Sequence, residues 1–230
     1  MNPVWIAVLV VGCAVEAVFI ILEQKKKMTA AVATKALASL LFVLLGVLCA
    51  YSSKDRAYAV MILIGLALGA IGDICLNLRH LVGSRGKAVF MAGIAAFLIG
   101  HLFYLFALIS RAPKMLLWAV PACAVVSVLM LRFILKRIEA QGAIRVFGIV
   151  YLVVVFQMMC CALGLLPLQP SNPGYLLFAA GAVLFAASDV LLVLNQFGKR
   201  QYPAFRPMNL SLYYLGQICI ALTIAFLPAL

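Results

Sequence analysis

Charged residues are scarce in this sequence. They make up 10% of its 230 residues and only six of them are acidic, whereas 67% of the residues are hydrophobic and the mean hydropathy is +1.20. A soluble domain of this length needs a polar surface that such a composition cannot supply. Strand-type alternation is also missing, and the apolar runs are broken only by short basic segments. The sequence therefore predicts an all-α, polytopic membrane bundle.

Motifs for metal, redox or serine chemistry are missing as well. The chain has two histidines, His80 and His101, and no H-E-x-x-H pattern, so we expect no metal site and no cofactor. The seven cysteines all lie in apolar runs and none has the C-x-x-C spacing, which indicates packing residues rather than a disulfide framework. No G-x-S-x-G motif is present, which argues against acyl transfer through serine.

Long apolar runs dominate what is present. A spanning helix needs about 20 apolar residues, and eight runs meet this need. The expected spans are 3–22, 30–51, 57–78, 88–109, 114–133, 144–165, 174–194 and 208–227. The first run lacks a basic leader and an A-x-A cleavage site, so we expect a retained helix. We interpret residues 1–230 as a single integral membrane domain.

Basic residues are unevenly divided between the loops. The odd-numbered loops hold Lys25, Lys26, Lys27, Arg79, Arg85, Lys87, Arg132, Lys136, Arg137, Arg145, Lys199, Arg200 and Arg206, and the even-numbered loops hold Lys54, Arg56, Arg111 and Lys114. The positive-inside rule then places the odd loops in the cytoplasm and both termini on the other side. Topology and contact with anionic membrane lipids account for the net charge of +12, so no nucleic-acid partner is expected. We expect a bacterial inner (cytoplasmic) membrane.

Two aspartates lie inside predicted spans, Asp73 in "GAIGDICLNL" and Asp189 in "FAASDVLLVL". An intramembrane aspartate costs about 2.5–3.5 kcal/mol on insertion scales and usually faces a cavity or a partner. Each aspartate lies five residues before the end of its span, about 7–8 Å inside the cytoplasmic boundary. This depth predicts a site toward the cytoplasmic leaflet.

Other polar residues have structural alternatives. Glu16 could pair with Lys35, and Lys35 could instead extend to the interface. The two adjacent tyrosines Tyr213 and Tyr214 could belong to an aromatic belt. His101 lies deeper, near mid-bilayer, and could be a packing histidine. Two further residues have similar alternatives: an interhelical hydrogen bond for Asn77, and a packing or orienting role for Ser188.

The aspartates also suggest an internal repeat. They are 116 residues apart (189 minus 73), close to half the chain, and the same offset pairs Gly65 with Gly181. Two four-span halves would be parallel and related by an axis along the membrane normal. The half-repeats would be residues 1–112 and 113–230. The two carboxylates could then face each other in one low-dielectric cavity, where they rarely both ionise and so provide an acid and a base.

The ordered set of residues resembles the lysoplasmalogenase family, also called YhhN-like. The resemblance covers most of the chain and rests on Gly72, Asp73, Phe90, Gly93, Phe97, His101, Tyr104, Ser188, Asp189, Tyr213, Tyr214 and Gln217. Lys35 matches a family lysine, although Ala36 stands where the family has proline. The resemblance implies eight spans and hydrolysis of the vinyl-ether bond of lysoplasmenyl-ethanolamine or lysoplasmenyl-choline, giving a fatty aldehyde and a glycerophospho-base.

This chemistry suits two carboxylates. One aspartate would protonate the vinyl ether, and the other would stabilise the resulting oxocarbenium ion and activate water. The expected catalytic residues are Asp73, Asp189 and His101. The expected substrate-binding residues are Glu16, Lys35, Asn77, Tyr104, Ser188, Tyr213, Tyr214 and Gln217. The expected partners are the lysophospholipid substrate and the membrane lipids.

Other functions fit the same residues. A lysophospholipid ester hydrolase could use the same carboxylate pair. A proton-coupled lipid or small-molecule transporter can also combine parallel repeats with intramembrane carboxylates, but its site should lie near the midplane. A purely structural membrane protein would need both aspartates engaged in ion pairs, for instance with Lys35.

Overall fold

The computed structural model describes residues 2–168 and 170–227, and this part of the chain is helical without a β-strand. The helices are α1 (Pro3–Gln24), α2 (Met28–Ala50), α3 (Arg56–Leu78), α4 (Gly86–Ile109), α5 (Leu116–Leu135), α6 (Gly142–Leu165), α7 (Pro173–Phe197) and α8 (Phe205–Phe226). All eight are long and apolar enough to cross a membrane. The predicted all-α bundle of eight spans is confirmed, and the helix ends differ from the predicted ones by at most three residues.

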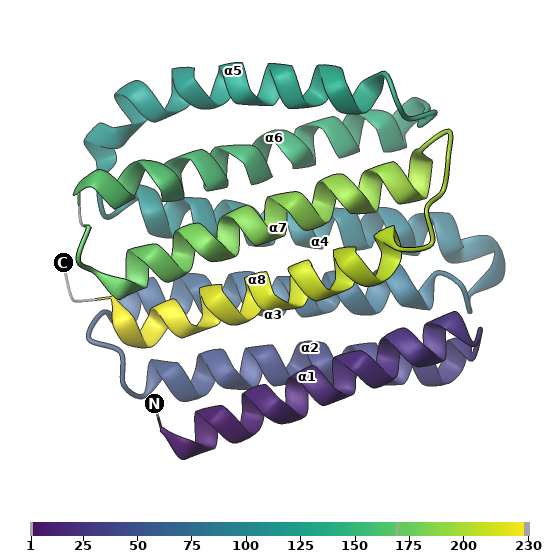
Figure 1. Cartoon of the computed structure of the whole chain (residues 1–230), viewed down its shortest axis with the longest axis horizontal. Coiled ribbons are helices and arrows are strands. Elements are labelled where there is room, and N and C mark those ends of the chain that lie inside the picture. Colours follow the sequence, from purple (N-terminus) through teal and green to yellow (C-terminus); the bar gives the residue numbers. More distant parts are fainter. Residues whose placement is uncertain (1, 169, 228–230) are drawn as a thin grey trace.

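The helices that begin at one end of the bundle differ in their N-terminal caps from those that begin at the other end. At one end, side-chain oxygens of Asn2, Asp55 and Asn172 cap α1, α3 and α7 by accepting a backbone N–H of the first turn. At the other end, α2, α4, α6 and α8 begin without such a side-chain cap. The odd-numbered loops, which carry most of the basic residues, lie at this second end, opposite the start of α1 and the end of α8 (Figure 1). We call it the basic end.

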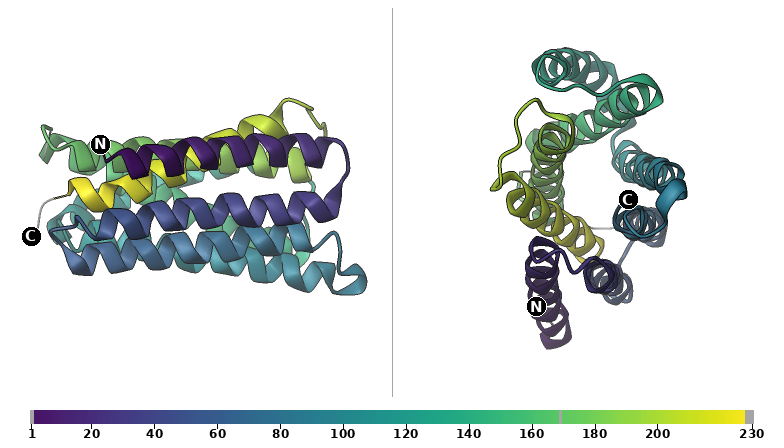
Figure 2. Two further views of the ribbon diagram at one scale, coloured as in Figure 1. Left: turned by 90° about the horizontal axis from the view of Figure 1, so that it is seen from below. Right: turned by 90° about the vertical axis from the view of Figure 1, so that its right-hand side faces the viewer.

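Six helices form a closed ring. Neighbours contact in the order α2, α3, α4, α6, α7, α8 and back to α2, while α1 packs outside α2 and α5 outside α6. The end-on view shows α3 and α4 facing α7 and α8, with the other two helix pairs at opposite edges (Figure 2). Apolar side chains on the outer faces are exposed, as in Val10, Leu40 and Phe106. Most of the buried polar side chains belong to ring helices, as Lys35, Asp73 and Asp189 do, where they are shielded from lipid.

Glycines bring two helix pairs into backbone contact. A Cβ placed on Gly100 in α4 would lie 3.1 Å from the Gly65 carbonyl oxygen in α3. A Cβ placed on Gly216 in α8 would lie 3.0 Å from the Gly181 carbonyl oxygen in α7. Small residues permit such close packing in membranes, where helices gain little from hydrophobic burial. The two contacts are separated by the same 116-residue offset as the aspartates, and the internal repeat itself remains a prediction.

Candidate active site in the membrane

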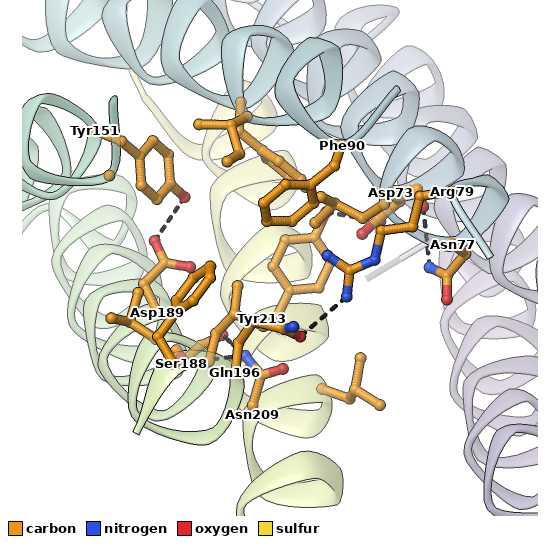
Figure 3. Close-up of a pocket in the computed structure, with 18 of the residues that line it drawn as sticks. Asp73, Asn77, Arg79, Phe90, Tyr151, Ser188, Asp189, Gln196, Asn209 and Tyr213 are labelled. Atoms are coloured by element: carbon orange, nitrogen blue, oxygen red, sulfur yellow. Dashed lines mark hydrogen bonds between the residues drawn. The ribbon is translucent and has the colours of Figure 1, made fainter. Parts of the chain in front are cut away.

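A cavity of about 100 Å³ lies inside the ring toward the basic end. All six ring helices contribute to its walls, which are apolar for the most part, with Ile94, Phe97 and Val193 among the lining residues. Both predicted aspartates line it, one from α3 and one from α7. Figure 3 shows Asp189 on one side of the pocket and Asp73 on the other. The topology therefore brings together two carboxylates that are far apart in the sequence.

Asp73 has several polar neighbours. The hydroxyl of Ser39 donates to its Oδ2 atom at 2.5 Å, and the hydroxyl of Tyr213 donates to the same atom at 2.8 Å. The Nζ atom of Lys35 lies 3.7 Å from this oxygen. The aspartate is only 5% exposed, so these groups replace the water that a carboxylate would otherwise need. This arrangement stabilises the ionised form of the side chain.

Lys35 is buried, with 1% of its surface exposed, and does not extend to the membrane surface. Its Nζ atom lies 3.2 Å from Oε1 of Glu16 and over the ring of Tyr213, 4.7 Å from the centroid. The alternative in which Lys35 extends to the interface is therefore wrong, and the alternative in which it pairs with Glu16 is confirmed. One ammonium group thus lies between the carboxylates of Glu16 and Asp73.

Asp189 has a simpler environment. The Tyr151 hydroxyl of α6 donates to its Oδ2 atom at 2.6 Å (Figure 3). Within residues 2–168 and 170–227, no lysine or arginine lies at ion-pair distance from this carboxylate. Asp189 is 3% exposed, and apart from the Tyr151 phenol it faces the largely apolar cavity.

Two amide side chains fix the helices that carry the aspartates. Asn209 of α8 donates from Nδ2 to the carbonyl oxygen of Ser188 at 2.9 Å and to its hydroxyl at 2.8 Å. Asn77 donates to the Asp73 carbonyl oxygen within α3. All of these residues line the cavity, and the role of Ser188 stays a prediction.

A chain of hydrogen bonds leads from Asp73 deeper into the bundle. The Tyr213 hydroxyl, which donates to Asp73, accepts a hydrogen bond from Nε2 of Gln217 at 3.3 Å. The Oε1 atom of Gln217 accepts in turn from the Tyr104 hydroxyl at 2.9 Å. Gln217 and Tyr104 do not line the cavity; they hold Tyr213 in place from behind.

His101 and Tyr214 also lie outside the cavity walls, as does Glu16. The Nδ1 atom of His101 lies 2.7 Å from the Phe97 carbonyl oxygen, and its ring packs edge-on against Phe185. Its Nε2 atom has no hydrogen-bond partner among the described residues. The Tyr214 hydroxyl donates to the Ala38 carbonyl oxygen and so joins α8 to α2.

A polar pocket of about 250 Å³ lies next to the cavity at the basic end, and we call this pocket the vestibule. It is lined by Glu23, Arg79, His80, Leu192, Asn195, Gln196, Gln201, Arg206 and Asn209. Several of these residues, among them both arginines, also line the cavity, so the two spaces share a wall. The polar vestibule thus lies directly beside the largely apolar cavity.

Two arginines at the junction are held by partners. Arg206 donates from Nε and Nη2 to the two carboxylate oxygens of Glu23, at 2.8 and 2.5 Å. Arg79 donates to the Gln196 side-chain oxygen at 3.0 Å and to Nε2 of His80 at 3.2 Å. Partial burial and the adjacent Arg79 guanidinium lower the pKa of His80, so this ring is neutral at pH 7.

The site residues that were not predicted include Ser39, Tyr151, Arg206 and Asn209. The sequence held a signal for three of them. Ser39 follows Lys35, and Asn209 precedes Tyr213, by four residues, which places each pair on one helix face. Tyr151 lies 116 residues after Lys35, at the offset of the predicted repeat. In the described part of the chain, no three His, Cys, Asp or Glu side chains group to form a metal site.

These features define an integral membrane protein with a buried polar site toward one end of a helical ring. The model of the YhhN family matches residues 30–224. The chain belongs to this family, which includes lysoplasmalogenases. No curated protein and no solved structure matches the chain.

Proposed function

We propose that the protein is a lysoplasmalogenase that hydrolyses the vinyl-ether bond of lysoplasmenyl-ethanolamine or lysoplasmenyl-choline. The observation that carries this proposal is a single, largely apolar cavity lined by both Asp73 and Asp189. Its apolar walls suit an alkenyl chain, and its vestibule suits a polar head group. Membership of a family that includes lysoplasmalogenases supports the same reaction.

The reaction needs one acid and one base. A protonated carboxyl group transfers its proton to the β-carbon of the vinyl ether, which leaves an oxocarbenium ion at the α-carbon. Water adds to the α-carbon and gives its proton to the second carboxylate. The hemiacetal then breaks its bond to the glycerol oxygen, which takes up a proton, and the fatty aldehyde leaves. The cation resembles that of glycoside hydrolysis, which also uses a carboxylate pair.

The different surroundings of the aspartates support a division of roles. Asp189 has a phenol neighbour but no cation at ion-pair distance among the described residues, which suits a group that arrives with a proton. Asp73 has two hydroxyl donors and Lys35 nearby, which suits a group that stays ionised. We therefore assign the proton donor to Asp189, and the cation-stabilising base to Asp73.

The position of the cavity fits a lysolipid in the cytoplasmic leaflet. The cavity lies toward the basic end, which the positive-inside rule assigns to the cytoplasm. Both termini would then face the opposite side, and we propose a bacterial inner membrane as the location. A transporter would need a site near the midplane with access from both sides, whereas this cavity joins a vestibule at one end.

The test is hydrolysis by the purified protein in detergent. Lysoplasmenyl-ethanolamine is supplied, and release of fatty aldehyde is measured, with the ester lysophospholipid as the comparison substrate. We expect aldehyde release from the wild-type protein and its loss in Asp73→Asn and Asp189→Asn variants that elute as folded protein. Faster cleavage of the ester would identify a lysophospholipase, and no cleavage of either lipid by folded wild-type protein would refute the proposal.

A further inference from the structure

The vestibule carries both signs of charge. Arg79 and Arg206 supply two guanidinium groups at its junction with the cavity, and Glu23 supplies a carboxylate. Arg206 and Glu23 pair with each other, and their side chains are 33% and 16% exposed, so an entering ligand can reach both. An ion pair that is open to a ligand can exchange its internal partner for groups of opposite charge on that ligand.

The remaining lining is rich in neutral hydrogen-bonding groups. Asn195, Gln196 and Gln201 add amide oxygens that can accept from an N–H donor. No Phe, Tyr or Trp side chain is among the described residues that line this space. Quaternary ammonium groups are typically bound by aromatic rings, whereas a primary ammonium group needs hydrogen-bond acceptors.

We propose that the vestibule is a head-group site that selects a zwitterionic phosphoethanolamine, with Glu23 as the residue that determines this choice. The phosphate lies at the junction, where Arg79 and Arg206 bind it. The primary ammonium group lies at Glu23, which accepts its hydrogen bonds. The assignment rests on the proposed function, since a lysolipid bound in this way directs its first chain bond into the cavity between the aspartates.

The charges also disfavour two related head groups. A choline head group keeps its positive charge but has no N–H to donate to Glu23 or to the amide oxygens. A bare phosphate monoester satisfies the arginines but brings additional negative charge next to the Glu23 carboxylate. We therefore expect ethanolamine to bind more tightly than choline, and more tightly than the monoester.

The experiment measures binding without cleavage. Saturated 1-O-alkyl lysolipids lack the vinyl group, so they occupy the site without reacting in the proposed mechanism. Occupancy of the full-length protein in detergent is measured by native mass spectrometry for three lipids, which carry phosphoethanolamine, phosphocholine or a bare phosphate. We expect the ethanolamine lipid to bind about tenfold more tightly than the choline lipid, the difference that one charge-assisted hydrogen bond supplies.

Variants separate recognition from folding. Glu23→Gln should remove the preference for ethanolamine and increase binding of the bare phosphate lipid, while Arg79→Gln should weaken binding of all three lipids. Glu139→Gln and Arg85→Gln serve as matched controls, because both residues are exposed at the basic end and line neither space. We expect both controls to bind as the wild type does.

Several outcomes would overturn this inference. Equal binding of ethanolamine and choline lipids by the wild-type protein would do so without any variant. Equal weakening of all three lipids in Glu23→Gln would show that Glu23 only joins α1 to α8. Selective binding without aldehyde release from a vinyl-ether lipid would refute the proposed hydrolysis and leave the head-group site intact. Hydrolysis without head-group preference would support the proposed reaction and refute the head-group site.

Discussion

The two aspartates line one cavity but differ in what surrounds them. Asp73 accepts hydrogen bonds from two hydroxyl groups and lies beside Lys35, which also pairs with Glu16. Asp189 accepts from the Tyr151 hydroxyl and has no cation at ion-pair distance in residues 2–168 and 170–227. The same side chain at the same predicted depth thus has different hydrogen-bonding and charged neighbours at its two positions.

The different neighbours of the two aspartates lie at positions that the predicted repeat makes equivalent. Under the predicted repeat, Tyr151 in α6 takes the place of Lys35 in α2, and each residue contacts the aspartate of the next helix. Phe97 takes the place of Tyr213, so Asp189 has no counterpart of the Tyr213 hydroxyl that donates to Asp73. We propose that these differences help to distinguish the acid from the base.

The largest expected effect concerns this division of roles. Asp189→Asn should lower kcat by about 10²–10⁴, the usual contribution of a general acid, because proton transfer to carbon begins the reaction. Asp73→Asn should lower kcat less, because the Asp189 proton donor is kept and only the stabilisation of the cation and the activation of water are weakened. Aldehyde release at saturating vinyl-ether substrate measures both values. A greater loss in Asp73→Asn would reverse the assignment.

Replacing Lys35 tests how much its ammonium group contributes to the stability of the protein. Lys35→Met leaves the carboxylates of Glu16 and Asp73 buried without their shared ammonium group. We expect the free energy of unfolding to fall by about 3–5 kcal/mol, measured by thermal unfolding in detergent. The added Glu16→Gln change should restore part of this loss. Lys54→Met, at an exposed position of the opposite end, is the control, and an equal effect of both lysine variants would contradict the assigned role.

Loss of a hydroxyl donor should matter more for Asp189 than for Asp73. Tyr151→Phe removes the hydroxyl that donates to Asp189, and we expect a cost of about 1–3 kcal/mol for leaving a buried group without its partner. Ser39→Ala leaves Asp73 with Tyr213 and should cost about 0.5–1.5 kcal/mol. The free energy of unfolding of both variants is measured under one condition. Equal losses in the two variants would contradict the prediction.

The smallest expected effect concerns pH. The pKa of His80 is lowered in the folded protein, chiefly by partial burial and then by Arg79. Its neutral form is therefore favoured by folding, and the resulting stability is present above about pH 6.5 and is lost as the pH falls through the lowered pKa. His80→Gln should remove this slight acid sensitivity and leave the pH–rate profile unchanged. A changed acid limb of that profile would place His80 in the reaction.

The sequence predicted the spans well because hydropathy and length are local properties. It also predicted that both aspartates line one cavity, because a carboxylate in an apolar run can be recognised without knowing how its helix packs. It did not predict Tyr151, Arg206 or Asn209 as site residues, because their roles depend on which helices meet and on how each is rotated. The structure places His101, predicted as catalytic, behind the cavity wall, and the depth estimate alone could not distinguish these positions.

The Glu16–Lys35 ion pair has a consequence for how the chain enters the bilayer. The two charges belong to consecutive helices, 19 residues apart, and face each other across the hairpin that α1 and α2 form. Each helix inserted singly would carry an unpaired charge into hydrocarbon, at a cost of about 2.5–3.5 kcal/mol for Lys35. Insertion of the two helices as one hairpin brings the charges in as a pair. The lysine that lies beside Asp73 would thus enter the bilayer already paired, from a hairpin that precedes α3 in the sequence.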